Sequence, residues 1–153
     1  MDVGAGIAGG ALVNPSLELL DIDELRPHER TRPDLLNALI AEIKRDGKLK
    51  LPILVERSHQ VILDGHHRAE ALRALGCVRV PSYVVDYFSE EIRVTTWPDA
   101  SVDHVTKEEV LERGRTGNLF PPKTTRHLVK GKLAESPVAL RDLMQAARAR
   151  SGA

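Results

Sequence analysis

The feature that most constrains this fold is an apolar run that passes through one glycine directly into a helix-forming stretch. Residues 61–76 read VILDGHHRAEALRALG, in which Val and Ile favour a strand and the Ala- and Leu-rich part favours a helix that stops at Gly76. The run PILVER (52–57) lies just before QVILD (60–64), with two polar residues between them. This spacing predicts a β-hairpin whose second strand leads into a helix.

Further strands and helices are interleaved around this unit. A helix is predicted from Pro33 to an exit at Gly47, with Thr31 and Asp34 spaced as a capping box. Its apolar residues fall on one helical face: Leu35, Leu36, Leu39, Ile40 and Ile43. Other strands are expected at 16–20, 78–87 and 91–97. The alternation predicts a mixed α/β or α+β domain, with a small mixed sheet flanked by helices.

The last third of the chain has its own helix signals. Thr106 and Glu109 form a capping-box pattern that predicts a helix from about Lys107 to Arg113. Ser136 and Pro137 occupy positions typical of a helix start, so VALRDLMQAARAR is expected to form a closing helix. Its Leu140, Leu143 and Met144 could form a dimer face, although the core is the better expectation, and the oligomeric state stays open.

Length and composition predict one domain. The 153 residues are 42% hydrophobic, which suits a single core, so we expect residues 16–153 to form one domain on which helices within 106–150 pack. Residues 1–15 lack a basic n-region and are expected to be a flexible leader rather than a signal peptide. One cysteine, Cys77, and no long apolar run predict a cytoplasmic protein without a membrane partner. Cys77 is expected to be a buried, unreactive thiol.

The charge balance argues against nucleic acid as a partner. Lys and Arg total 22, Asp and Glu total 22, and the formal net charge is zero. A neutral chain has no overall attraction to a polyanion, so we expect no nucleic-acid partner.

The strand-to-helix turn carries a set of groups suited to a phosphate. Backbone N–H groups at a helix start have no helical acceptors, Gly65 lets an anion approach closely, and Arg68 offers bidentate donors. His66 and His67 can donate without a permanent charge. In the alternative interpretation, Asp64 merely caps the helix and the histidines are surface residues.

A metal site built on the histidine pair is disfavoured, because adjacent helical positions diverge and no zinc-type spacing accompanies them. Mg²⁺ carried by a nucleotide needs only one or two carboxylates, and Asp64 is placed to be one.

Two further clusters are candidates for binding and catalysis. In RPHERTRP (26–33), Glu29 could accept a proton from a substrate hydroxyl, although a solvated, charge-rich turn is the simpler interpretation. In FPPKTTRH (120–127), cations and hydroxyls suit a carboxylate or phosphate, and a helix start capped by threonine is about equally expected. Trp97 is expected in the core, with a binding wall as the alternative.

The combination of these motifs resembles the free serine kinases of the ParB/sulfiredoxin-like superfamily. The resemblance rests on LRPHE, VILDGHHRAEALRALG, VVDY, IRVTTW and GNLFPPKTTRH, and covers roughly residues 17–130. DGHHR together with PPKTTRH is more specific than DGHHR alone.

This resemblance implies an enzyme that transfers a phosphoryl group from ATP or ADP, with Mg²⁺, to the hydroxyl of free L-serine, giving O-phospho-L-serine. It implies Glu29 as the catalytic base and Asp64 as a second essential acid, and assigns the phosphates to the turn from Asp64 to Arg68. It places the amino-acid substrate near the only tryptophan and the KTTRH residues: Trp97, Lys123, Thr124, Thr125, Arg126 and His127.

Other members of the superfamily suggest alternative functions. A ParB-type DNA clamp would need a basic helix-turn-helix module, for which the residues after Trp97 supply neither length nor charge. A sulfiredoxin-like reductase would place its cysteine in the turn, where His66 or His67 stands instead. A nucleotide-binding or nucleotide-hydrolysing module without kinase activity remains the alternative.

Overall fold

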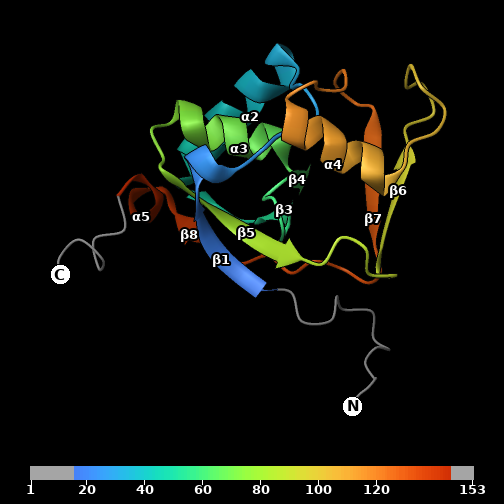
Figure 1. Ribbon diagram of the computed structural model, residues 1–153. Coiled ribbons are helices and arrows are strands. Elements are labelled where there is room, and N and C mark those ends of the chain that lie inside the picture. The colour runs from blue at the N-terminus through green and yellow to red at the C-terminus, as the bar shows by residue number, and fades with distance from the viewer. Residues whose placement is uncertain (1–15, 146–153) are drawn as a thin grey trace.

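The hairpin expected between residues 52 and 64 forms half of a four-stranded sheet in the computed structural model, which describes residues 16–145. The first half of the chain forms β1 (Ser16–Asp21), the 3₁₀ turn η1 (Ile22–Glu24), α2 (Pro33–Asp46), β2 (Lys48–Leu49), β3 (Ile53–Glu56), β4 (Ile62–Asp64) and α3 (His66–Ala74). The second half forms β5 (Arg79–Val85), β6 (Ile92–Thr96), α4 (Lys107–Thr116), β7 (Thr125–Val129), β8 (Val138–Ala139) and α5 (Leu140–Met144). The predicted mixed α+β class is confirmed (Figure 1).

The sheet has the strand order β1-β5-β3-β4 and mixes the two strand directions. β5 runs antiparallel to β1, with Ser16 opposite Val84, and parallel to β3, with Ile53 beside Ser82. β3 and β4 are antiparallel, as the hairpin prediction required, with an irregularity in register at Leu54 and Val55. α3 lies between β4 and β5 in the chain, so the helix also serves the crossover that parallel strands need.

Alternate residues of the central strands pack into two separate cores. Ile53 and Val55 of β3 belong to a cluster that includes residues of α2, α3 and α5, whereas Leu54 packs in a second cluster with Tyr87 and Val110. Successive strand residues point to opposite faces, so both faces of the sheet are buried at β3, whereas the edge strand β1 has an exposed face with Leu17 and Leu19. This explains why the sequence of β3 is apolar over three successive residues, Ile53 to Val55, instead of alternating.

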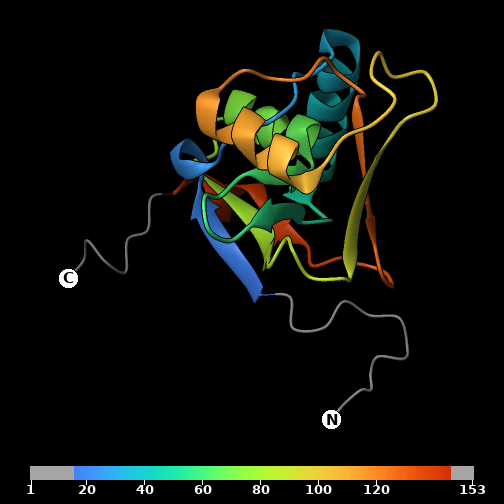
Figure 2. The same ribbon diagram turned by 45° about the vertical axis from the view of Figure 1, so that its right-hand side comes forward.

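Strands β6 and β7 form a separate antiparallel ribbon, with Ile92 opposite Val129 and Thr96 opposite Thr125. The ribbon stands at the side of the molecule away from α5 (Figures 1 and 2). The pairing brings the end of the IRVTTW segment beside the TTRH segment, although they are far apart in the sequence.

Local signals were right at the end of α2, where Gly47 is the C-cap, and at the start of α4. Thr106 and Glu109 form both hydrogen bonds of the expected capping box on α4. The capping box predicted for α2 is wrong, because Arg32 is the N-cap. The Asp34 carboxylate accepts hydrogen bonds from the Arg32 guanidinium instead of one from the Thr31 N–H.

The closing helix begins later than predicted. Val138 and Ala139 pair with β2 as β8, so α5 starts at Leu140 rather than at Pro137, and residues 146–150 lie outside the described residues, as does the expected leader 1–15. Leu140 and Leu143 are buried in the core as expected, whereas Met144 is exposed.

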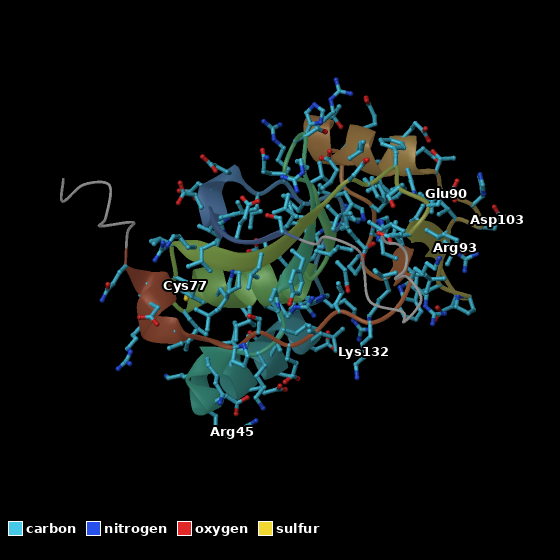
Figure 3. The ribbon with its side chains drawn as sticks, turned by 90° about the horizontal axis from the view of Figure 1, so that it is seen from below. Arg45, Cys77, Glu90, Arg93, Asp103 and Lys132 are labelled. Atoms are coloured by element: carbon cyan, nitrogen blue, oxygen red, sulfur yellow. The ribbon has the colours of Figure 1, made fainter. Side chains whose placement is uncertain are left out.

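Cys77 is buried near α5, where burial raises the pKa of its thiol (Figure 3). This confirms the expected burial, and a raised pKa leaves little reactive thiolate at neutral pH. Within residues 16–145, every helix falls short of the length and apolarity needed to cross a membrane.

Candidate active site

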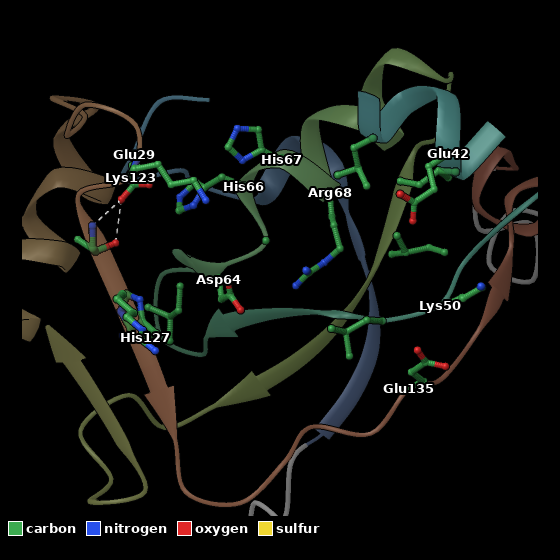
Figure 4. A pocket seen from close by; sticks show the side chains of 18 of the residues that line it. Glu29, Glu42, Lys50, Asp64, His66, His67, Arg68, Lys123, His127 and Glu135 are labelled. Atoms are coloured by element: carbon green, nitrogen blue, oxygen red, sulfur yellow. Dashed lines mark hydrogen bonds between the residues drawn. The ribbon is translucent and has the colours of Figure 1, made fainter. Parts of the chain in front are cut away.

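A cavity of about 740 Å³ collects the motifs singled out in the sequence. It is lined by the loop before α2, the β4–α3 turn, the end of the β6–β7 ribbon and the segment after α2. Each predicted site residue except Thr124 lines this cavity. Glu29, His67 and Lys123 lie at one end, Glu42 and Glu135 lie at the other, and Asp64 and Arg68 lie between (Figure 4).

The β4–α3 turn requires glycine at its corner. Gly65 has a φ of 112°, and a Cβ there would lie 2.5 Å from Ile53 Cγ2 and 2.9 Å from Arg68 Nη2. The Ala69 N–H donates to the Gly65 carbonyl at 2.9 Å, which places the N–H groups of residues 65–68 ahead of the first helical hydrogen bond. The helix start therefore presents backbone donors and the positive end of its dipole at the cavity.

Arg68 extends from this turn as a half-buried cation with spare donors. Its Nη2 donates to the Pro52 carbonyl at a long 3.5 Å, and its buried Nε has no hydrogen-bond partner among the described residues. Burial lowers the pKa of Arg68, and the nearby Asp64 carboxylate acts in the opposite direction. A buried Nε–H without an acceptor is unfavourable on its own, so this arrangement is suited to an incoming anion.

The two histidines of the turn are fixed by backbone donors. His66 Nε2 accepts the His28 backbone N–H at 3.2 Å, and His67 Nε2 accepts the Arg32 backbone N–H at 2.9 Å. Each neutral ring therefore carries its proton on Nδ1. Burial is the main cause that lowers the pKa of both rings, so they are neutral hydrogen-bond donors at neutral pH. The alternative of plain surface histidines is wrong for His66, which is buried.

Glu29 is held by the PPKTTRH segment. The Lys123 N–H donates to Glu29 Oε2 at 3.0 Å, and both the Thr125 N–H and the Thr125 hydroxyl donate to Oε1 at 2.9 Å. Lys123 has a φ of 61°, which is unusual for a residue with a side chain. This uncommon backbone conformation occurs at the residue whose N–H donates to the Glu29 carboxylate. Burial raises the pKa of Glu29, opposed by these hydrogen bonds. The alternative of a solvated turn is therefore wrong for Glu29, which is 9% exposed.

The PPKTTRH segment is not a helix start, because Thr125 begins β7, so the alternative of a threonine-capped helix is wrong. Trp97 lines the cavity and donates its Nε1–H to the Thr125 carbonyl at 3.0 Å. Lys123 Nζ and the Arg126 guanidinium lie 5.4 Å and 4.8 Å from the Trp97 ring. Thr124 is buried, and its hydroxyl donates to the Pro121 carbonyl at 2.7 Å.

His127 is neutral, and its ring is held by the hydroxyl of Tyr87. Its Nε2 lies 2.7 Å from the Tyr87 hydroxyl. Burial lowers the pKa of His127 to about 3 and raises the pKa of Tyr87, so a Tyr87 O–H that donates to Nε2 satisfies both groups. Sequence reasoning quoted VVDY, which ends at Tyr87, but gave Tyr87 no role in the site, because its hydroxyl is placed by tertiary packing.

The far end of the cavity was also missed. Charged residues gather there from α2, from β2 and the residue after it, and from the segment before β8: Glu42, Asp46, Lys48, Lys50 and Glu135. They belong to no motif, and the basic KLK run at 48–50 was the only local signal that could have pointed to them. Asp64 is the exposed carboxylate at the turn, and no group of three or more potential metal ligands occurs within residues 16–145.

Comparison with known proteins agrees with this geometry. The chain is 35% identical over 102 residues to an ATP-dependent L-serine kinase from Staphylothermus marinus, a match that covers 63% of this chain and 40% of the relative. It is 35% identical over 98 residues to the ADP-dependent L-serine kinase SerK from Thermococcus kodakarensis, covering 61% and 40% respectively. The matched segment thus spans about two fifths of these curated relatives. No family model matches the chain.

Among solved structures, a free serine kinase in complex with AMP superposes with a TM-score of 0.75 at 21% identity, covering 93% of this chain and 98% of the other. The fold is therefore the fold of the free serine kinases. The similarity to L-serine kinases expected from the sequence is confirmed.

Proposed function

We propose that this protein is a small-molecule kinase that transfers a phosphoryl group from ATP or ADP to the hydroxyl of free L-serine, giving O-phospho-L-serine. The observation that carries the proposal is the cavity in which a buried, hydrogen-bonded Glu29 carboxylate and an anion-binding helix start with an unpaired Arg68 donor occur together. A general base and a phosphate site within one cavity are what alcohol phosphorylation requires.

In this proposal the β4–α3 turn holds the phosphates. The backbone N–H groups of residues 65–68 and the Arg68 guanidinium neutralise the charge of the transferred group, with His66 and His67 as additional neutral donors. Asp64 fits Mg²⁺ as a nucleotide-borne ion, because such an ion keeps most of its other ligands as phosphate oxygens and water. When bound, Mg²⁺ would neutralise phosphate charge, while the residues of this chain position the reacting groups.

The end of the cavity near Trp97 is the proposed amino-acid site. Glu29 orients the serine hydroxyl and accepts its proton as the oxygen attacks phosphorus. Lys123 and Arg126 lie over the Trp97 ring and offer cations for the serine carboxylate. Thr125 and His127 line the same end, whereas the buried hydroxyl of Thr124 is already paired and supports the turn instead.

A nucleotide-binding or nucleotide-hydrolysing module without kinase activity is the second candidate, because the phosphate site alone would serve it. Glu29 argues against a module that only binds a nucleotide, whereas a hydrolase would use the same carboxylate to activate water. A buried carboxylate fixed by two backbone N–H groups and a hydroxyl has no part in binding phosphate, whose charge it would repel.

Phosphorus NMR tests the proposal directly. Purified protein with Mg²⁺ and L-serine is incubated in parallel with ATP and with ADP, and parallel samples replace serine by homoserine or threonine. A new phosphomonoester signal that requires L-serine is expected, and the nucleotide that produces it is the donor. Loss of nucleotide without that signal would support the hydrolase instead.

A further inference from the structure

A buried histidine, His28, lies behind Glu29 and outside the cavity lining. Its side chain is fully buried, with Nδ1 2.6 Å from the Ile62 carbonyl oxygen and Nε2 2.8 Å from Thr125 Oγ1. A carbonyl oxygen can only accept, so Nδ1 carries a proton. In the neutral ring Nε2 is therefore an acceptor, and the Thr125 hydroxyl is the group that faces it.

The Thr125 hydroxyl has one proton and two acceptors within reach. Glu29 Oε1 lies 2.9 Å from Thr125 Oγ1 on one side, and His28 Nε2 lies 2.8 Å away on the other. One hydroxyl proton cannot serve both. When Glu29 is ionised, the charged oxygen is the stronger acceptor, and His28 Nε2 is left without a donor in a buried position, which is unfavourable.

We propose that His28 and Thr125 form a hydrogen-bond switch that raises the basicity of Glu29. When Glu29 gains a proton, its oxygen becomes a weaker acceptor, and the Thr125 hydroxyl turns to His28 Nε2. The protonated state of Glu29 is thereby stabilised, because it is the state in which the buried imidazole is satisfied.

The catalytic part of this inference rests on the proposed kinase function. In that reaction the serine oxygen forms a bond to phosphorus, the bond from phosphorus to the nucleotide oxygen breaks, and the serine proton moves to a Glu29 oxygen. The Thr125 proton only changes its acceptor, and His28 gains none. His28 is therefore a positioning residue that touches neither substrate.

Burial keeps His28 neutral among the titratable groups around the switch, although its hydrogen bond to the Ile62 carbonyl acts in the opposite direction. The rings of His66 and His127 face it, with centroids 4.5 Å and 5.7 Å away, and burial lowers the pKa of both. Burial likewise lowers the pKa of His28 to about 4, whereas burial raises that of Glu29. Lys123 meets Glu29 through its backbone N–H, and its Nζ lies 5.4 Å from the Trp97 ring.

NMR on the intact protein without substrate tests the switch. Protein labelled with ¹⁵N-histidine and ¹³C-glutamate is titrated, following the His28 ring nitrogens and the Glu29 carboxyl carbon. We expect Nδ1 to stay protonated, and the Nε2 signal to change from that of a free to that of a hydrogen-bonded acceptor at the same midpoint as Glu29. An Nε2 signal that is constant through the Glu29 titration would overturn the proposal.

Variants of His28 and Thr125 should move the Glu29 titration midpoint in directions that a change in packing alone would not produce. His28→Phe leaves the Thr125 hydroxyl permanently with Glu29, so the Glu29 midpoint should fall by about one pH unit. Thr125→Val removes a donor to the carboxylate and should raise the midpoint, whereas Thr125→Ser keeps the hydroxyl and should hold the parent value. In the Thr125→Val background, His28→Phe should have no effect.

An equal effect of His28→Phe in both backgrounds would show that the ring acts through packing and would overturn the switch. If His28→Phe does not fold, the parent titration and the two Thr125 variants still decide the matter. These titrations contain no substrate, so their outcome is separate from that of the kinase assay.

Discussion

Gly65→Ala tests whether the corner of the β4–α3 turn is as tightly constrained as the structure indicates. Gly65 has a φ of 112°, outside the range that side chains favour, and a new Cβ would lie 2.5 Å from Ile53 Cγ2. Ile53 is fully buried in the core and has little room to move. The backbone conformation costs about 1–2 kcal/mol and overpacking about 1–3 kcal/mol, so the free energy of unfolding should fall by about 2–5 kcal/mol.

Gly76→Ala is the matched control. Gly76 also has a positive φ, 87°, but nothing lies within 4 Å of its Cβ position. This variant should lose only the backbone contribution of about 1–2 kcal/mol. Urea unfolding of the parent and both variants at one temperature gives the three free energies, provided the slopes agree.

The same substitution should also reach the phosphate site. The new Cβ would lie 2.9 Å from Arg68 Nη2, so Gly65→Ala should weaken ADP binding measured by calorimetry, whereas Gly76→Ala should not. Equal losses of stability in the two variants would show that Ile53 relaxes and would refute the steric argument. Unchanged ADP affinity in a folded Gly65→Ala protein would refute the assignment of this turn to phosphate.

Three further results are expected. Glu29→Gln should abolish most turnover in a steady-state assay and leave ADP affinity nearly unchanged, and a variant with normal turnover would remove Glu29 from the mechanism. Arg68→Ala should weaken ADP binding by about 1.5–3 kcal/mol in calorimetry, which is the range for hydrogen bonds to charged groups. Unchanged affinity would count against a phosphate site at the β4–α3 turn. Burial lowers the pKa of His28 from 6.5 to about 4 and the pKa of His127 from 6.5 to about 3. At a pH between the lowered pKa and 6.5, each of these histidines therefore binds fewer protons in the native state than in the unfolded chain. The free energy of unfolding should therefore fall as the pH is lowered from about 6.5 to about 4, and a thermal unfolding midpoint that is constant over this range would contradict those shifts.

Local chemistry made part of this protein predictable. The hairpin, the helix that follows Gly65 and the capping box of Thr106 with Glu109 all depend on neighbours within a few residues. Such interactions leave a periodicity or a fixed spacing in the sequence, and the corresponding predictions were right. The residue types of the DGHHR turn likewise indicated an anion site, because donors at a helix start are a local property.

The predictions that failed were overridden by other contacts, one local and one distant: the Asp34 carboxylate accepts hydrogen bonds from the neighbouring Arg32 guanidinium. The Arg32 N–H is taken by His67 Nε2, 35 residues away, and α2 begins without the cap that Thr31 was expected to supply. Val138 pairs with Leu49, which delays the start of α5. Only at α5 did a long-range strand pairing replace the local pattern.

The site itself depends on the same kind of contact. Glu29 receives donors from Thr125, 96 residues away, and Thr125 lies between Glu29 and His28, a histidine to which the sequence analysis gave no role. The far end of the cavity joins Glu42 to Glu135 across the folded chain. Hydrogen bonds between residues so far apart impose no spacing on the sequence, so the kinds of chemistry could be read from the motifs, whereas their assembly into one cavity required the packed sheet and ribbon.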